Sequence, residues 1–297
     1  MKVKEMENNK TKQLAVISGK GGTGKTTFTA AFASLSKEKI IADCDVDAPD
    51  LHLLLHPAIV KRYPFSGGRS PNVDLDKCTK CGLCTDACRF SAIEDGIIDL
   101  IKCDHCGVCA YVCPVDAIEM KDDINGEYFL SKTAYGLMVH AKLGIAEENT
   151  GKLVTAVRRK AIEEAKKNGN RLIIIDGPPG IGCPVNATIT GCNLVIAITE
   201  PTLSGMHDLE RVFSLTHHFK IPLVVVINKA DINQKNREEI IKFCDNNQIE
   251  IVGEVPFSRE VVDSLVQGKN VIEYPIKKVT ESIERIWEKV KNHSSLK

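Results

Sequence analysis

The sequence lacks three features that would each assign a protein to a broad class. Its 39 basic side chains are balanced by 39 acidic ones, so it has no excess positive charge for coating a polyanion such as DNA. No apolar run approaches the ~18 residues of a membrane span, and the polar stretch Met1–Gln13 lacks the apolar core of a signal peptide. We therefore expect a cytoplasmic protein with neither a nucleic-acid nor a membrane partner.

Disulfides are not expected either, although the chain has 12 cysteines, because the cytoplasm is reducing. Eight of them lie between Cys78 and Cys113, which makes metal binding the better interpretation. Such a cysteine-dense block within cysteine-poor sequence predicts a small inserted domain. We place it at residues 63–121, between the two parts of a larger domain at 1–62 and 122–297.

The larger domain is predicted to be α/β. Short, continuous apolar runs that alternate with helical patterns are typical of a parallel sheet covered by helices on both faces. A weaker alternation over Asn125–Leu143 indicates further strands. The expected strands are Leu14–Ser18, Lys39–Ala42, Leu172–Ile175, Leu194–Ile198 and Leu223–Ile227, and the expected helices are Thr26–Ser36, Asp50–Leu55, Lys152–Asn168 and Lys277–Asn292.

A glycine-rich segment, Gly19–Thr27, joins the first strand to the first helix and fits the P-loop pattern. Its glycines let backbone N–H groups turn inward around phosphate oxygens, and the following helix directs its positive end at the anion. Lys25 can reach the β- and γ-phosphates, and the Thr26 hydroxyl can bind Mg²⁺. The predicted nucleotide-binding residues are Gly19, Gly21, Gly22, Thr23, Gly24, Lys25, Thr26 and Thr27.

A second lysine in the loop, Lys20, gives the pattern Lys-Gly-Gly-x-Gly-Lys-Thr-Thr. This pattern resembles the deviant Walker A motif of the family that contains the MinD and ParA ATPases, the Mrp cluster carriers and the nitrogenase iron protein. The resemblance implies that ATP closes a homodimer and that Lys20 reaches the nucleotide of the partner. The alternative is an exposed loop lysine.

The resemblance extends to residues that follow the later strands. It implies that Asp45 orients the attacking water, that Asp43 supports Mg²⁺, and that Asp176 holds a Mg²⁺-bound water. Positioned carboxylates suit phosphoryl transfer. Gly177–Gly180 resembles a switch that senses the γ-phosphate. Asn228 resembles an adenine-reading residue, with an ordinary turn after a strand as the alternative.

The cysteine block contains C-x₂-C-x₂-C-x₃-C twice, which matches the run of bacterial two-cluster ferredoxins. In that family the fourth cysteine of each run binds the other cluster. The resemblance therefore implies two [4Fe–4S] clusters, and structural zinc is the alternative. The implied ligand sets are Cys78, Cys81, Cys84 and Cys113 for one cluster, and Cys88, Cys103, Cys106 and Cys109 for the other.

The remaining cysteines carry less information. We expect Cys44 and Cys244 to lie in the core, and Cys183 and Cys192 to be small buried residues. The alternative for Cys183 is that it acts as a bridging ligand to a cluster. The last helix reads as a packed closing helix, because its polar face mixes acidic and basic residues and is not the basic surface of a membrane-binding helix.

Three functions fit these motifs. The first is an ATPase whose nucleotide-dependent dimer gates electron transfer through the clusters. The second is a carrier of iron–sulfur or other metal clusters, and the third is a spatial organiser with redox-sensing clusters. The complete two-cluster pattern favours the first, because a carrier needs labile, accessible ligands. The electron donor, the acceptor and any cluster recipient stay unidentified.

Overall fold

The computed structural model describes residues 11–144, 151–274 and 276–297, which form two compact units. The core unit comprises the described residues within 1–63, 128–142 and 149–297, and the cysteine unit comprises those within 64–127 and 143–148. The cysteine unit contains all eight cysteines of the two runs. Each unit is described by itself below.

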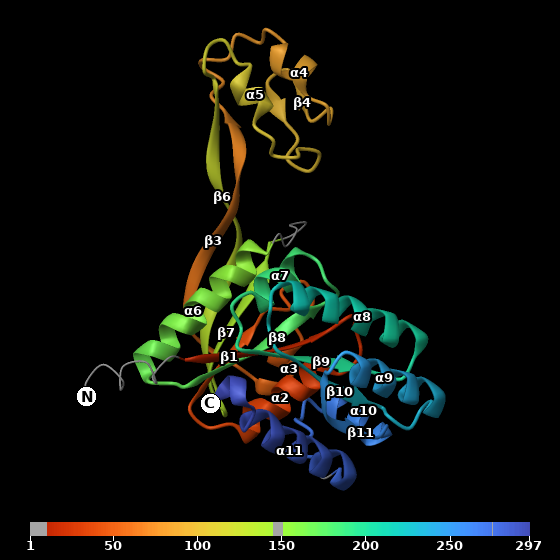
Figure 1. Cartoon of the computed structure of the whole chain (residues 1–297). Coiled ribbons are helices and arrows are strands. Elements are labelled where there is room, and N and C mark those ends of the chain that lie inside the picture. The colour runs from red at the N-terminus through yellow and green to blue at the C-terminus, as the bar shows by residue number, and fades with distance from the viewer. Residues whose placement is uncertain (1–10, 145–150, 275) are drawn as a thin grey trace, which may run out of the picture. The chain divides into compact units, whose positions relative to one another are not determined.

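A mostly parallel sheet forms the centre of the core unit (Figure 1). Over the described residues it has the strand order β11-β10-β9-β1-β8-β2-β7-β6-β3. Neighbouring strands from β11 to β7 pair in parallel. Its strands are β1 (Lys12–Ser18), β2 (Lys39–Asp43), β3 (Ala58–Val73), β6 (Ile118–Thr133), β7 (Gly136–Leu143), β8 (Leu172–Pro179), β9 (Leu194–Thr199), β10 (Leu223–Asn228) and β11 (Glu250–Val255).

Helices cover both faces of this sheet, with α2 and α11 on one face and α6, α7 and α8 on the other (Figure 1). The expected α/β fold with a mostly parallel sheet is therefore confirmed. The helices of the core unit are α2 (Lys25–Leu35), α3 (Leu51–Leu55), α6 (Lys152–Asn168), α7 (Cys183–Ile189), α8 (Leu203–His218), α9 (Gln234–Asn246), α10 (Arg259–Val266) and α11 (Lys277–Lys291), followed by the 3₁₀ turn η2 (Ser294–Leu296).

Burial explains why the central strands are apolar along their whole length. In β2 and β9 every residue is buried, because helices pack on both sides of the sheet. Helix α11 closes the core as expected: Trp287 is 4% exposed and its ring lies 5.1 Å from that of Phe32 on α2. No helix among the described residues is long and apolar enough to cross a membrane.

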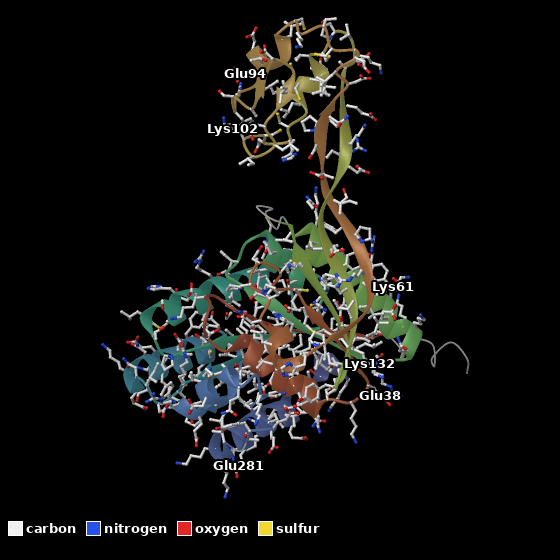
Figure 2. All side chains as sticks on the ribbon, turned by 180° about the vertical axis from the view of Figure 1, so that it is seen from behind. Glu38, Lys61, Glu94, Lys102, Lys132 and Glu281 are labelled. Atoms are coloured by element: carbon white, nitrogen blue, oxygen red, sulfur yellow. The ribbon has the colours of Figure 1, made fainter. Side chains whose placement is uncertain are left out.

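Strand β3 was not predicted from the sequence, and β6 begins before the predicted stretch Asn125–Leu143. Each spans 16 residues and runs from the core unit into the cysteine unit, and the two are neighbours in the sheet. A two-residue connection joins β6 to β7, which forces an antiparallel hairpin. In Figure 2, Lys61 and Lys132 extend from the outer edge that β3 and β6 give the core unit.

The cysteine unit has little regular structure besides these strands. It contains α4 (Leu83–Ala87), α5 (Val108–Tyr111) and the antiparallel ribbon of β4 (Ile93–Glu94) and β5 (Ile97–Ile98). Its apolar cluster centres on Ile93, Cys109 and Ile118, so cysteine side chains supply part of the core.

His140 on β7 makes the stability of the core unit depend on pH. Its Nε2 lies 2.8 Å from the Ser131 hydroxyl, and burial together with the nearby His52 lowers its pKa to about 4. The unfolded chain binds a proton near pH 6.5 that the folded chain does not, so the free energy of unfolding falls as the pH drops from 6.5 to 4. We expect this residue to account for at most roughly 3 kcal/mol of that loss.

Urea unfolding of His140→Gln between pH 7 and pH 4 checks this prediction. The variant should lose less stability across the window than the wild type, and the exposed His218→Gln should behave as the wild type. Equal slopes for His140→Gln and the wild type would show that His140 is not held neutral.

Candidate functional site

The glycine-rich loop lies between β1 and α2, at the carboxyl edge of the sheet. Gly22 and Gly24 have φ values of +79° and +100°, which side chains with a Cβ rarely adopt. Helix α2 begins with Lys25 and Thr26 directly after the loop, so the positive end of its dipole faces the loop. A cavity of about 510 Å³ opens here, and it is lined by Gly21, Gly22, Gly24, Lys25, Thr26, Thr27, Asp45, Ala48, Asp50, Leu53, Leu54, Pro179 and Leu265.

Asp176 connects this loop helix to the middle of the sheet. The Thr26 hydroxyl donates to its Oδ2 at 2.8 Å, and the Thr29 hydroxyl donates to its Oδ1 at 2.8 Å. Burial raises the pKa of Asp176 to about 6, although Lys25 and the two hydroxyls act in the opposite direction. Thr29 was not among the predicted site residues; it lies one helical turn after Lys25 and shares the carboxylate with Thr26.

Two further carboxylates lie beside Asp176. Asp43 is its neighbour in the register of β2 and β8, and Asp45 Oδ2 lies 3.5 Å from Lys25 Nζ. Asp43 Oδ2 and Asp45 Oδ1 are buried and accept no hydrogen bond within the described part of the chain. Burial raises the pKa of both carboxyls, and Asp176 raises that of Asp43 further.

These carboxylates fit a divalent cation. Buried carboxylate oxygens without a partner are unfavourable, and Mg²⁺ prefers oxygen ligands and keeps several of its waters. The Thr26 hydroxyl and the Asp176 and Asp43 carboxylates are therefore suited to hold Mg²⁺ or its waters beside bound phosphates.

Lys20 is held within its own chain in this structure. Its Nζ lies 2.6 Å from Glu200 Oε1 and 3.0 Å from the Ser204 hydroxyl. Lys229 binds the other oxygen of Glu200 at 2.9 Å. Hydrogen bonds from the two lysines hold the pKa of Glu200 below its usual value, although burial acts in the opposite direction. Glu200 was not among the predicted site residues. The local pattern that could have indicated it is a carboxylate directly after the buried strand β9.

Asn228 contacts the loop backbone. Its Nδ2 donates to the Thr23 carbonyl at 2.8 Å, and its Oδ1 accepts from the Lys229 backbone N–H at 3.0 Å. Asn228 also lines a second cavity of about 160 Å³, which shares Gly22, Gly24, Thr27 and Leu265 with the first. The rest of its lining is mostly apolar and includes Phe257, which suits a flat base.

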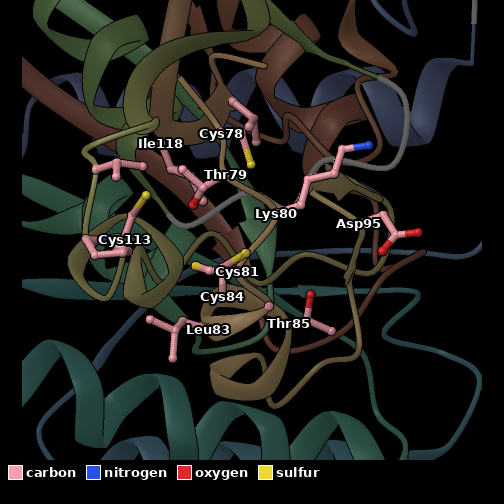
Figure 3. A pocket seen from close by; sticks show the side chains of 15 residues that line it. Cys78, Thr79, Lys80, Cys81, Leu83, Cys84, Thr85, Asp95, Cys113 and Ile118 are labelled. Carbon is pink, nitrogen blue, oxygen red and sulfur yellow. The ribbon is translucent and has the colours of Figure 1, made fainter. Parts of the chain in front are cut away.

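One implied ligand set surrounds a single cavity of the cysteine unit. Cys78, Cys81, Cys84 and Cys113 all line it, and Figure 3 shows their sulfur atoms turned toward its interior. The fourth cysteine therefore comes from the other run. Among the residues that the structure describes, no group of three or more His, Cys, Asp or Glu side chains is spaced to hold a single metal ion.

The second set is brought together less completely. Burial raises the pKa of the Cys109 thiol, and the neighbouring Cys103 and Cys106 raise it further. Cys88 packs in the same apolar cluster as Cys109. Cys88 and Cys109 thus share an apolar cluster, which also contains Cys84 and Cys113 of the other implied set.

The two cysteine runs have the same backbone conformation at positions 25 residues apart. Lys80 and His105 both have a φ of +54°, while Gly82 and Gly107 have φ values of +79° and +76°. The repeat includes hydrogen bonds to sulfur, since the Ala92 N–H donates to Cys88 Sγ at 3.4 Å and the Ala117 N–H to Cys113 Sγ at 3.2 Å. An N–H donor stabilises a thiolate, so this donor set fits cysteine-bound clusters.

The cysteines outside the runs are mostly structural. Cys44, Cys192 and Cys244 are buried, as expected, and the Cys192 thiol donates to the Thr188 carbonyl at 3.3 Å. The expectation of burial is wrong for Cys183, which is exposed at the start of α7. It begins this short helix directly after an exposed glycine, and the described residues leave its side chain exposed.

Known proteins resemble this chain over most of its length. A family model described as the CobQ/CobB/MinD/ParA nucleotide binding domain matches residues 14–271. An uncharacterized protein of Methanocaldococcus jannaschii is 36% identical, over 94% of this chain and 96% of its own length. An iron-sulfur cluster carrier protein of Pyrococcus abyssi is 22% identical, over 98% of this chain and 89% of its own. The solved structure of the septum site-determining protein MinD with Mg-ADP, from Pyrococcus horikoshii, is 16% identical with a TM-score of 0.58, covering 95% of this chain and 96% of that one.

The geometry of Gly24 predicts that the loop tolerates no side chain there. A Cβ on Gly24 would lie 2.7 Å from Asn228 Nδ2, at a φ of +100°. We expect Gly24→Ala to lower the free energy of unfolding by about 1–3 kcal/mol, because the backbone is strained and Asn228 must leave Thr23. Calorimetric unfolding measures this loss.

Gly21→Ala is the matched control. No heavy atom lies within 4 Å of a Cβ at that position. Its stability should stay within about 0.5 kcal/mol of the wild type. A Gly24→Ala protein as stable as the control would contradict the assigned contact between Gly24 and Asn228.

Proposed function

The chain belongs to the CobQ/CobB/MinD/ParA nucleotide-binding family, and from that premise we propose that it is an ATP-hydrolysing iron–sulfur protein. In this proposal, ATP closes a homodimer that gates electron transfer through two [4Fe–4S] clusters. The observation that supports it is that one chain contains both a P-loop and two repeated cysteine runs. One ligand set implied by these runs lines a single cavity.

The core unit supplies the nucleotide chemistry. The backbone N–H groups of the glycine-rich loop bind the phosphates, and Lys25 neutralises charge on the β- and γ-phosphates. Thr26, Asp43 and Asp176 hold Mg²⁺ and its waters, and Asp45 orients the attacking water. The apolar cavity beside Asn228 receives the base.

The cysteine unit supplies the redox chemistry. A bound [4Fe–4S] cluster accepts and donates single electrons, and the chain sets its environment through thiolates and their N–H donors. The eight cysteines of the two runs would hold the two clusters in the sets implied by the ferredoxin resemblance. The N–H groups of Ala92 and Ala117 stabilise charge on Cys88 and Cys113.

Dimer formation would exchange one partner of Lys20 for another. In the present structure Glu200 neutralises its ammonium group. In the proposed ATP-bound dimer, Lys20 leaves Glu200 and reaches the phosphates of the partner's nucleotide. A cation delivered to the transferring phosphate stabilises the charge that develops there.

A second candidate is a cluster carrier. Two ligand cysteines, Cys81 and Cys106, are exposed, and accessible ligands favour transfer of a cluster to another protein. The Pyrococcus relative is itself named as such a carrier. Transfer to a cluster-free acceptor, measured after mixing, separates this function from electron transfer.

The first experiment follows the oxidation of the dithionite-reduced protein by an acceptor dye under anaerobic conditions. With Mg·ATP we expect the rate to change by at least about fivefold, because nucleotide binding is coupled to the cysteine unit. Lys25→Ala should abolish this change while retaining iron and sulfide. Clusters that load fully and stay indifferent to ATP would overturn the gating proposal and favour the carrier.

Lys20→Met tests the role of the second lysine. We expect ATP binding to persist, while ATP turnover falls at least about 100-fold, because the positive charge no longer reaches the transferring phosphate. Light scattering should show no ATP-dependent dimer. The exposed Lys235→Met is the control and should dimerise and turn over normally. Normal dimers and turnover in Lys20→Met would refute the action across the dimer.

A further inference from the structure

Two stacked tyrosines mark the point where the chain passes between the units. Tyr63 is the last residue of the core unit on β3, and Tyr128 is its first residue on β6. Their rings lie 4.9 Å apart and 8° from parallel. The stacked pair therefore fixes the two neighbouring strands at one level, within the core unit.

A cation on α6 holds this pair. Lys160 Nζ lies 4.8 Å from the centre of the Tyr63 ring, and its side chain is only 10% exposed. Glu164 binds the same ammonium group at 3.0 Å and fixes its position. The attraction between a cation and a ring face is stronger where water is excluded, so Lys160 attaches α6 to the strand pair.

A second cation attaches α6 to α7. Arg158 is buried, and its Nη1 donates to the Ala187 carbonyl at 2.7 Å and the Thr190 carbonyl at 2.8 Å. These carbonyls lie at the negative end of α7, which a guanidinium stabilises. At the other end of the contact, a Cβ on Gly151 would lie 3.0 Å from the Cys183 carbonyl. The two helices are therefore in contact at both ends of α7.

Helix α7 in turn follows the segment 177–182, which includes Gly177–Gly180, the residues that resemble a γ-phosphate-sensing switch. This segment is tied to the loop strand, because the Gly180 N–H donates to the Ser18 carbonyl at 2.9 Å. A shift of the segment on nucleotide binding displaces the start of α7 and, through Arg158, the helix α6.

We propose that Arg158 and Lys160 are positioning residues that transmit the state of segment 177–182 to the Tyr63–Tyr128 pair. The strands that carry the cysteine unit thereby respond to the nucleotide. This inference rests on the proposed function, since it concerns how ATP acts on that unit. Neither residue touches the nucleotide cavity, so both act through other residues.

Hydrogen–deuterium exchange of the full chain, purified anaerobically, tests the proposal with and without Mg·AMP-PNP. In the wild type, the nucleotide should change exchange in segment 177–190 and also at the strand roots, residues 58–63 and 128–133. Tyr63→Leu should reduce the change at the roots by about threefold and leave that in segment 177–190 intact, because it removes the ring that Lys160 contacts.

Tyr63→Phe keeps the ring face but loses the hydroxyl, which also hydrogen-bonds Lys160, so its response at the roots should lie between those of the wild type and Tyr63→Leu. Lys160→Met should reproduce the effect of Tyr63→Leu, whereas Lys166→Met, exposed on the same helix, should not. In each variant the Kd for the analogue should stay within about twofold of the wild type, because the nucleotide cavity is untouched.

The outcomes separate the two proposals. A wild type that binds the analogue, shows a response in segment 177–190 and shows none at the roots overturns this inference alone. Equal root responses in Tyr63→Leu and the wild type overturn it as well. A wild type that binds no nucleotide overturns the proposed function, and the inference falls with it.

Discussion

The carboxylate of Asp176 is the constraint on which the core unit depends. It is fully buried within β8 and is held by hydroxyls from the first and second turns of α2. A buried charge must be paired, hydrogen-bonded or beside a cation, so this carboxylate fixes the helix that follows the phosphate loop against the middle of the sheet. The parallel strands then bring Asp43 to its side. The site thus collects its charges at one sheet edge, where the ends of parallel strands meet.

The candidate phosphate site and the cysteine unit use different chemical groups. The phosphate site uses backbone N–H groups, a lysine and carboxylates on a rigid parallel sheet. The cysteine unit has few secondary-structure elements, and thiol side chains supply much of its apolar cluster. A small domain with so little core gains stability from bound metal, because only the folded chain brings the ligands together. If the unit binds clusters as proposed, its folding would therefore be coupled to their binding.

The local features of the sequence were sufficient to predict much of the fold. Helix α6 has the predicted bounds and ends at Gly169, because a C-capping glycine and helical periodicity are both local signals. The P-loop and the cysteine runs are local for the same reason. The contacts of Lys20 with Glu200, and of Lys160 with Tyr63, join residues 180 and 97 positions apart, which no short pattern encodes. Strand β3 was not predicted, because its residues include Gly67, Gly68 and Pro71, which are unfavourable in a strand interior, yet an edge strand tolerates them.

The adjacency of β3 and β6 has a consequence for how such a chain can arise. Because the cysteine unit leaves and re-enters the core unit through neighbouring strands, its two ends lie side by side in the sheet. An insertion between neighbouring strands closes a loop that the sheet already holds together, so its entropic cost grows only slowly with its length. The ancestral connection here needs to have been no more than a short hairpin turn. The sheet edge can thus accept an inserted unit without rebuilding of the loop between β1 and α2.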